Sequence, residues 1–243
     1  MARRGVLDAT VTVAAGLAIL VGLGVWQLDR RAWKEDLIAR TAARLNTKSE
    51  NLPPRVQWDK LTAAESEFQR VEFPAELIPD QEALVYTAGS AFRPDVSGAG
   101  YWVLAPVRLA GGSVVVINRG FVPLERRDPA NRPAPSSAGV TEFTGVLRWP
   151  DARGLFTPAD EPARNVWYVR DAKLIAAAKG WGDVAPFLVD QEAPQNPGGV
   201  PRVGPLSVRL SNNHLQYALT WFGLALGLAG IYVTWLVTRL RRY

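Results

Sequence analysis

Two long uncharged apolar segments lie near the two ends of this 243-residue chain. Thr10–Leu28 runs for 19 residues without a charge, and Tyr217–Val237 runs for 21. As α-helices these segments would be roughly 28 and 31 Å long, which matches the ~30 Å hydrocarbon core of a bilayer. The sequence therefore predicts a membrane protein with two transmembrane helices and a large domain between them.

A cleaved signal peptide is the alternative interpretation of the first segment. The apolar part of a signal peptide usually covers about 7–15 residues and ends at small residues that allow cleavage. Here the apolar run is longer and leads directly into Trp26, Gln27 and Asp29. We therefore expect an uncleaved anchor and five regions: a cytoplasmic N-terminus (1–9), the first span (10–28), an extracytoplasmic domain (29–216), the second span (217–237) and a basic cytoplasmic tail (238–243).

The net charge of +5 comes almost entirely from the two ends. The ends carry five arginines and one aspartate, whereas residues 29–216 carry 23 basic and 22 acidic side chains. A nearly neutral domain argues against a nucleic-acid partner, which requires a basic face. Basic residues that flank spans favour the cytoplasm. Arg30, Arg31 and Lys34 oppose this orientation, but the loop that follows them far exceeds the ~60 residues over which the rule holds. We predict a multi-pass protein of the cell inner membrane with its domain in the periplasm, or of the mitochondrial inner membrane in a eukaryote.

The region between the spans has the pattern of an antiparallel β-rich (α+β) domain, with a barrel as one possible form. Gly111-Gly112 separates two apolar runs and predicts a hairpin. Helix formers in Trp33–Leu45 predict that the first span continues as a helix into the domain. The expected strands are Gln69–Ile78, Ala83–Thr87, Tyr101–Arg108, Val114–Phe121, Val140–Trp149, Val166–Val169 and Phe187–Asp190, and the expected helices are Thr62–Phe68 and Asp171–Lys179.

Composition restricts the chemistry that the chain can carry out. It has no Cys, one His and one Met, which is the first residue. Disulfides, Cys-ligated zinc, iron–sulfur clusters and thiol catalysis are therefore excluded. A His-rich metalloenzyme is excluded by the same count, and a copper carrier, which needs several soft or imidazole ligands, is disfavoured.

The single histidine stands at the outer mouth of the second span. On a helix His214, Tyr217, Ala218 and Trp221 share one face. An imidazole beside aromatic rings suits a flat apolar macrocycle, since neutral imidazole is an axial ligand of haem iron. Asn212 and Asn213 are the expected N-cap residues of this helix. The alternative for His214 is a structural role, in which it caps the helix or bonds a carbonyl while the aromatic rings form an interfacial belt.

Small residues at four-residue spacing predict where the two spans would pack. Ala14, Ala18 and Gly22 form such a row in the first span, and Gly223 and Gly227 form one in the second. Small residues allow close approach of two helices in a membrane. This contact would bring the outer mouths of both spans together.

Three motifs give the chain a resemblance to a known family. The run Asn212–Phe222 (NNHLQYALTWF), the run Gly24–Lys34 (GVWQLDRRAWK) and the run Val116–Pro123 (VINRGFVP) resemble motifs of the surfeit-locus-one/Shy family of assembly factors for haem–copper cytochrome c oxidase. Phe121 replaces the tryptophan that is usual in the third motif. The similarity covers the whole chain in the same order and with the same two-span layout.

The resemblance implies a protein without enzymatic activity that binds haem a and aids its insertion into the largest subunit of the oxidase. The implied iron ligand is His214, with Tyr217 and Trp221 beside it and with Trp26 and Gln27 on the other wall. Trp26 and Gln27 can equally serve as interfacial anchors. The expected partners are the oxidase subunit, haem A synthase and the lipid bilayer.

Arg119, in the third motif, has three possible partners: a haem propionate, a carboxylate of a partner protein, or a carboxylate of its own domain in a structural ion pair. Gly120 beside it is expected to adopt a positive φ.

Two other functions remain open. A scaffold that holds oxidase assembly intermediates without haem would share every feature except His214. A hydrolase of the extracytoplasmic domain would have to use His214 in a Ser-His-Asp site, although that residue is placed at the membrane.

Overall fold

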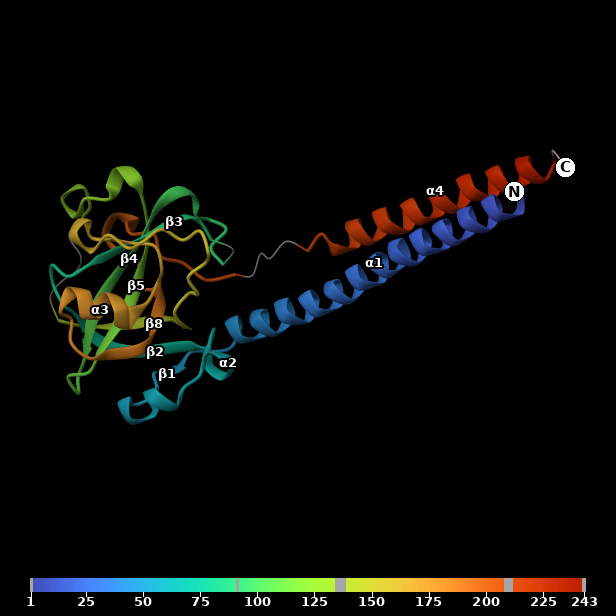
Figure 1. Cartoon of the computed structure of the whole chain (residues 1–243). Coiled ribbons are helices and arrows are strands. Elements are labelled where there is room, and N and C mark those ends of the chain that lie inside the picture. Colours follow the sequence, from blue (N-terminus) through green and yellow to red (C-terminus); the bar gives the residue numbers. More distant parts are fainter. Residues whose placement is uncertain (1, 91, 134–138, 208–211, 242–243) are drawn as a thin grey trace. The chain divides into compact units, whose positions relative to one another are not determined.

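The computed structural model of the chain describes residues 2–90, 92–133, 139–207 and 212–241. It consists of a helical unit, residues 1–40 with 210–243, and a β domain, residues 41–209. The helices are α1 (Ala2–Leu45), η1 (Arg55–Lys60), α2 (Ala63–Ser66), η2 (Leu124–Arg126), η3 (Pro129–Asn131), η4 (Pro162–Arg164), α3 (Ala172–Lys179), η5 (Pro197–Gly199) and α4 (His214–Leu240) (Figure 1). The strands are β1 (Glu50–Asn51), β2 (Arg70–Leu77), β3 (Ala83–Gly89), β4 (Ser97–Leu109), β5 (Val114–Pro123), β6 (Val140–Arg148), β7 (Val166–Trp167) and β8 (Val184–Ala193).

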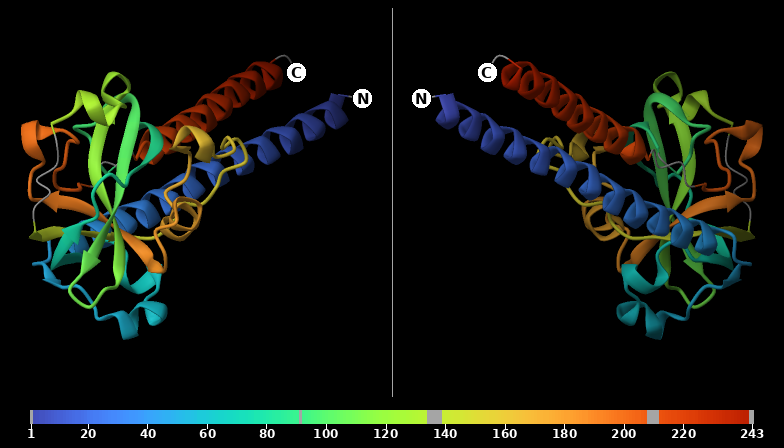
Figure 2. Two further views of the ribbon diagram at one scale, coloured as in Figure 1. Left: turned by 90° about the vertical axis from the view of Figure 1, so that its left-hand side faces the viewer. Right: turned by 90° about the vertical axis from the view of Figure 1, so that its right-hand side faces the viewer.

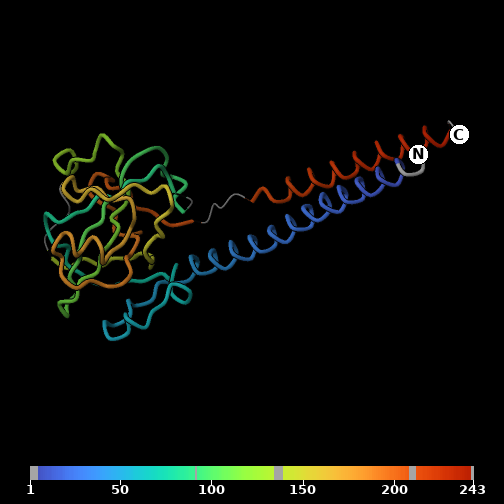
Figure 3. Tube along the Cα trace, in the orientation of Figure 1, coloured from blue at the N-terminus to red at the C-terminus, as the bar shows by residue number. Residues whose placement is uncertain are grey.

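The two expected apolar helices are confirmed as α1 and α4. Both are long and apolar enough to cross a membrane, and the trace in Figure 3 shows each as an unbroken coil. α1 has 44 residues and includes Trp33–Leu45. The helix expected after the first apolar segment is therefore a direct continuation of that segment, because no Gly or Pro interrupts its backbone there.

A closed five-stranded barrel forms the centre of the β domain. Figure 2 shows this domain from two sides. The strands follow one another in the order β2, β6, β8, β5 and β4, and β4 pairs again with β2. Closure leaves no free edge within the ring. The other strands extend the sheet outside it: β1 pairs with β2, β3 with β4, and β7 with β3.

The β-rich barrel expected from the sequence is confirmed, although its strands are not all antiparallel. β5 and β8 run parallel inside the ring, and the short pairs β1–β2 and β3–β7 are also parallel. Parallel neighbours require a long crossover. The chain between β5 and β8 provides it, since it contains β6, β7 and α3.

The barrel interior is filled by apolar side chains from all five strands. They include Phe73 of β2, Val107 of β4, Ile117 of β5, Leu147 of β6 and Phe187 of β8. Trp58, which is fully buried, packs edge-on against the ring of Phe187 with 5.5 Å between the ring centroids. The side chains that alternate with these face outward, as the period of two along a strand requires.

A second apolar layer covers the outer face of β3, β4, β5 and β8. Ala172, Ile175 and Ala176 of α3 pack there among Val116, Leu188 and their neighbours. β5 is therefore buried on both faces, and for this reason its sequence is a continuous apolar run rather than an alternating one. The Gly111-Gly112 hairpin that precedes β5 is confirmed, with Leu109 N–H donating to the carbonyl of Ser113 at 2.9 Å.

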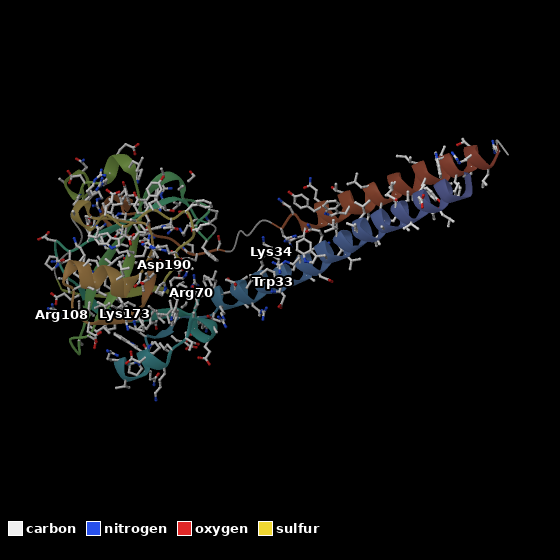
Figure 4. The ribbon with its side chains drawn as sticks, in the orientation of Figure 1. Trp33, Lys34, Arg70, Arg108, Lys173 and Asp190 are labelled. Atoms are coloured by element: carbon white, nitrogen blue, oxygen red, sulfur yellow. The ribbon has the colours of Figure 1, made fainter. Side chains whose placement is uncertain are left out.

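A network of charges is centred on the buried Asp190 of β8, which is labelled in Figure 4. Its carboxylate accepts a hydrogen bond from Asn118 Nδ2 at 2.8 Å and lies 3.4 Å from Arg148 Nη1 and 3.3 Å from Arg170 Nη1. Arg170 also pairs with Asp151 at 2.8 Å. Burial raises the pKa of Asp151, but the hydrogen bond and the charge of Arg170 together lower it by more. The pKa of Asp151 is therefore below its ordinary value. The network joins three barrel strands through charge-assisted bonds.

Replacement of Asp190 by Asn tests this network. The D190N substitution removes the negative charge that Arg148 and Arg170 share, and we expect a loss of about 3 kcal/mol in the free energy of unfolding. The measurement is urea unfolding of the full chain in detergent, followed by tryptophan fluorescence. D183N is the matched control, because Asp183 is 74% exposed in its pair with Arg55 and its loss should cost less than about 1 kcal/mol. Equal effects of the two variants would contradict a structural role for the network.

Candidate functional site

α1 and α4 pack against each other in an antiparallel arrangement within the helical unit. Near one end of the pair, Thr10 Oγ1 and Tyr232 Oη lie 2.6 Å apart. Near the other end, Gln27 Oε1 and His214 Nδ1 also lie 2.6 Å apart. Apolar surface alone does not drive helices together in lipid, so interhelical hydrogen bonds and close packing must hold such a pair.

The closest packing occurs at Gly24 of α1. A Cβ atom there would lie 2.5 Å from the ring of Phe222 on α4, so only glycine leaves room for that ring. A second close approach joins Gly16 to Leu228, where a Cβ would lie 3.2 Å from Cδ2. Ala218 and Ala225 are the buried residues of α4. Small residues thus form the contact, as membrane helix pairs require.

The prediction that the two rows of small residues form this contact is wrong. Ala14, Ala18 and Gly22 are exposed on α1. Gly223 and Gly227 are exposed on α4, and no atom lies within 4 Å of a Cβ built on either of them or on Gly22. Both spans contain so many small residues that several helical faces satisfy a four-residue spacing. The face of each helix that makes the contact is determined by large partners such as Phe222. A search for small residues at four-residue spacing does not detect these partners.

The hydrogen bond between Gln27 and His214 determines the chemistry of the imidazole. An amide oxygen only accepts, so the ring donates through Nδ1. The neutral ring then keeps a lone pair on Nε2. In the part of the chain that the structure describes, no hydrogen bond reaches Nε2 and no carboxylate bonds the ring. The half-buried imidazole is therefore held in one tautomer with a free electron-pair donor, and a hydrolytic Asp-His pair is not formed among these residues.

Asn212 lies two residues before this histidine and has an unpaired polar atom. Its Oδ1 is buried without a hydrogen-bond partner among the described residues. Asn213 occupies the N-cap position of α4, but its side chain makes no capping bond. The sequence indicated both residues as caps. The structure places them at the helix start without that function, which leaves an acceptor near His214 unsatisfied.

The aromatic residues expected around His214 are not enclosed. Tyr217 is 55% exposed and Trp26 is 51% exposed, whereas Trp221 is partly buried. Trp33, labelled on α1 in Figure 4, lies under the guanidinium of Arg30, 4.5 Å from Cζ to the ring centroid. The structure thus brings Gln27 to His214 and leaves the other rings available to a ligand or to lipid.

Arg119 belongs to the β domain and lies at a cavity of about 220 Å³. Its Nη2 donates to Asn196 Oδ1 at 3.0 Å, and the described residues place no carboxylate in an ion pair with it. The expected internal ion pair is therefore not formed there. Burial lowers the pKa of the guanidinium, the charge of Glu82 raises it, and the charge of Arg132 lowers it further.

Gly120 beside it has a φ of +113°, as expected. A Cβ there would lie 2.3 Å from the carbonyl oxygen of Arg202, so glycine is required for this close crossing.

Comparison with known proteins assigns the chain to a family. The model of the SURF1 family matches residues 14–226. This chain belongs to the SURF1 family. Two motifs of this SURF1-family chain, Gly24–Lys34 and Asn212–Phe222, contact each other directly through Gln27 with His214 and through Gly24 with Phe222. The sequence placed Gln27 on the wall opposite His214, but it indicated neither their hydrogen bond nor the packing of Phe222 against Gly24.

Several curated proteins of the SURF1 family are similar to the chain over most of its length. A SURF1-like protein of Monosiga brevicollis is 33% identical, and the alignment covers 85% of this chain and 79% of that protein. Surfeit locus protein 1 of Xenopus tropicalis is 32% identical over 88% of this chain and 72% of its own. The human Surfeit locus protein 1 is 30% identical over 84% and 69%. These comparisons confirm the family resemblance found in the sequence, which implies a role in the assembly of cytochrome c oxidase.

Substitution of Gly24 tests the helix contact. G24L should drive α1 from α4, because its side chain would occupy the space of the Phe222 ring. G22L, two residues away on the exposed face, is the matched control and should have little effect. The measurement is cross-linking of T10C to Y232C with a short bifunctional thiol reagent, since the chain has no other cysteine. We expect at least a tenfold lower cross-linking rate in G24L, and an unchanged rate would contradict the contact.

Proposed function

We propose that this SURF1-family protein binds haem a through His214 and presents it for insertion into the largest subunit of cytochrome c oxidase. The observation that carries the proposal is the hydrogen bond from His214 Nδ1 to Gln27 Oε1 at 2.6 Å. It leaves Nε2 as a free donor on a fixed ring, which is the form of imidazole that ligates haem iron.

The residues around the imidazole fit such a cargo. Tyr217 and Trp26 expose apolar rings beside the mouth of the helix pair, and the orphaned Oδ1 of Asn212 is an acceptor for a polar substituent. The chain has no second histidine and no methionine beyond the first residue. A sixth iron ligand would therefore come from another molecule, or the iron would remain five-coordinate.

Gln27 acts on the iron through His214. A hydrogen bond to the remote nitrogen of a ligating imidazole fixes its orientation and increases its basicity. The bond also joins α1 to α4, so any movement that separates the two helices releases the ring and weakens its grip on the cargo. A single, adjustable ligand suits a carrier that must give up its haem. Only the bond between the iron and the imidazole would form and break in this role, and the covalent bonds of the haem would stay unchanged.

The proposed setting is the outer side of the inner membrane. The basic residues at both chain ends favour a cytoplasmic location for those ends and an extracytoplasmic location for the β domain. In this arrangement, His214 lies at the outer membrane boundary, where the protein would receive haem a from haem A synthase and transfer it to the oxidase subunit.

Absorption spectroscopy of the purified full chain from cells that make haem a tests the cargo. The wild-type protein should show a Soret band, and H214A should lose it. Q27L should weaken haem binding about 10- to 100-fold, as loss of the hydrogen bond to a ligating histidine does. Q216L is the matched control, because Gln216 is an exposed glutamine at the start of the same α4, and it should bind haem normally.

The same spectra distinguish a carrier from a haem-independent scaffold. A wild-type protein that lacks the Soret band in cells with ample haem a, and that still supports oxidase assembly, would favour the scaffold. An H214A protein with an unchanged band would show that the iron ligand lies elsewhere.

Single-cysteine labelling tests the orientation, because the natural chain contains no thiol. Val56 in η1 of the β domain is 81% exposed, and Leu240 at the end of α4 is 65% exposed. We expect V56C to react with a membrane-impermeant maleimide in intact bacterial cells. L240C should react only after the inner membrane is permeabilised. The opposite result would place the β domain in the cytoplasm.

A further inference from the structure

Arg119 is a buried charge without an ionic partner. Three arginines are buried in the described part of the β domain. Arg93 pairs with Asp95 at 2.7 Å, and Arg148 pairs with Glu67 at 3.3 Å and with Asp190 at 3.4 Å. Arg119 is only 9% exposed, and its sole partner there is the neutral amide of Asn196. A buried charge that lacks a counter-ion costs several kcal/mol, so its presence calls for an explanation.

The fold holds this guanidinium at one end of the barrel interior. Along β5, Arg119 follows Val115 and Ile117 in the alternation that faces the core. The next residue, Gly120, allows the chain near Arg202 to cross β5 closely. Asn196 locks the backbone there, because its Nδ2 donates to the carbonyls of Arg119 and Pro201 at 2.8 and 2.7 Å. Arg119 is thus a rigidly placed donor.

The cavity beside Arg119 is suited to a carboxylate on a short apolar stem. Leu77, Ile78 and three prolines provide apolar walls. Arg132 and Glu82, which also line the cavity, form an ion pair at 2.5 Å. The carboxylate of Asp80 is part of the same lining, so the two arginines and two carboxylates around the cavity are equal in number. The single hydrogen bond to Asn196 leaves further N–H groups of the Arg119 fork available, and a guanidinium fork matches a carboxylate in geometry. At about 220 Å³, the space is smaller than pockets for drug-sized ligands, which hold roughly 300–1,000 Å³. The body of a porphyrin does not fit.

An open surface depression, here called the groove, adjoins this cavity. It has a volume of about 530 Å³, and it shares Asp80, Glu82 and Pro129 with the cavity. Such a groove can hold a segment of polypeptide whose side chain or terminus enters the cavity. The continuity of groove and cavity favours a protein over a small acid as the source of the carboxylate.

We propose that the Arg119 cavity binds a carboxylate group presented by a segment of a partner protein lying in the adjoining groove. The cavity is lined by residues of the β domain alone, and the proposal does not depend on haem binding. The carboxylate would supply the counter-ion that Arg119 lacks within its own domain.

The first test separates a binding arginine from a structural one. R119M replaces an unpaired buried charge by an apolar chain of similar length. The melting temperature of the full chain in detergent should therefore stay the same or rise. R148M removes an arginine that is paired with Asp190 and Glu67, and the melting temperature should fall by several degrees. A fall in R119M as large as that in R148M would overturn the proposal, because it would make Arg119 a structural residue.

The second test measures carboxylate binding directly. N-acetylglutamate amide is titrated against N-acetylglutamine amide, which differs from it only in the charged group, at constant ionic strength. The glutamate compound should raise the melting temperature by about 3–6 °C at tenfold excess over its dissociation constant, and the glutamine compound should not. R119M should abolish the shift. R119K keeps the charge but loses the fork, and it should require about tenfold more ligand. No shift in the wild type, or an equal shift in R119M, would overturn the proposal.

Haem spectra distinguish the source of the carboxylate. If a protein segment supplies it, R119M retains a wild-type Soret band and loses association with the purified oxidase subunit. If R119M instead loses haem and N-acetylglutamate amide displaces haem from the wild type, the carboxylate is a propionate, which overturns the proposed protein source. Loss of the band in H214A with normal carboxylate binding would separate this site from the proposed haem site.

Discussion

The hydrogen bond between Gln27 and His214 is the interaction on which the proposed site depends. It fixes the imidazole tautomer, and it joins α1 to α4 across 187 positions of sequence. Gly24, one turn of α1 away, allows the Phe222 ring to approach the helix backbone, so the two helices lie close together beside this bond. Packing of small and large residues in the apolar region therefore positions a polar pair near its end. Two of the motifs shared with the SURF1 family supply these four residues.

The β domain uses charge in two contrasting ways. Around Asp190, carboxylates and arginines are matched, so the buried charges hold β5, β6 and β8 together. At the opposite face of β5, Arg119 remains unmatched beside a cavity. Both features come from one short segment, since Asn118 serves the network, Arg119 faces the cavity, and Gly120 admits a neighbouring chain. Each residue of the Asn-Arg-Gly part of the third motif thus has its own structural surroundings.

Sequence patterns predicted the elements better than the contacts between them. The two spans, the hairpin at Gly111-Gly112 and the strand-rich domain follow from local hydrophobic patterns, and the structure confirms them. The helix-packing face was wrong, because the residue that selects it, Phe222, lies almost two hundred positions from Gly24. The parallel pairing of β5 with β8 was missed for a related reason. Strand direction depends on the path of the intervening chain, and no local pattern records that path.

The position of β8 in the ring has a consequence for incomplete chains. β8 (Val184–Ala193) is the last strand in sequence, yet it lies between β6 and β5. A polypeptide that stops before this strand would leave two neighbouring strands with unpaired backbone groups and would expose the apolar side chains they enclose. Premature termination upstream of residue 184 would thus yield an open, aggregation-prone sheet that is still attached to α1. Quality-control proteases would recognise and degrade such a product.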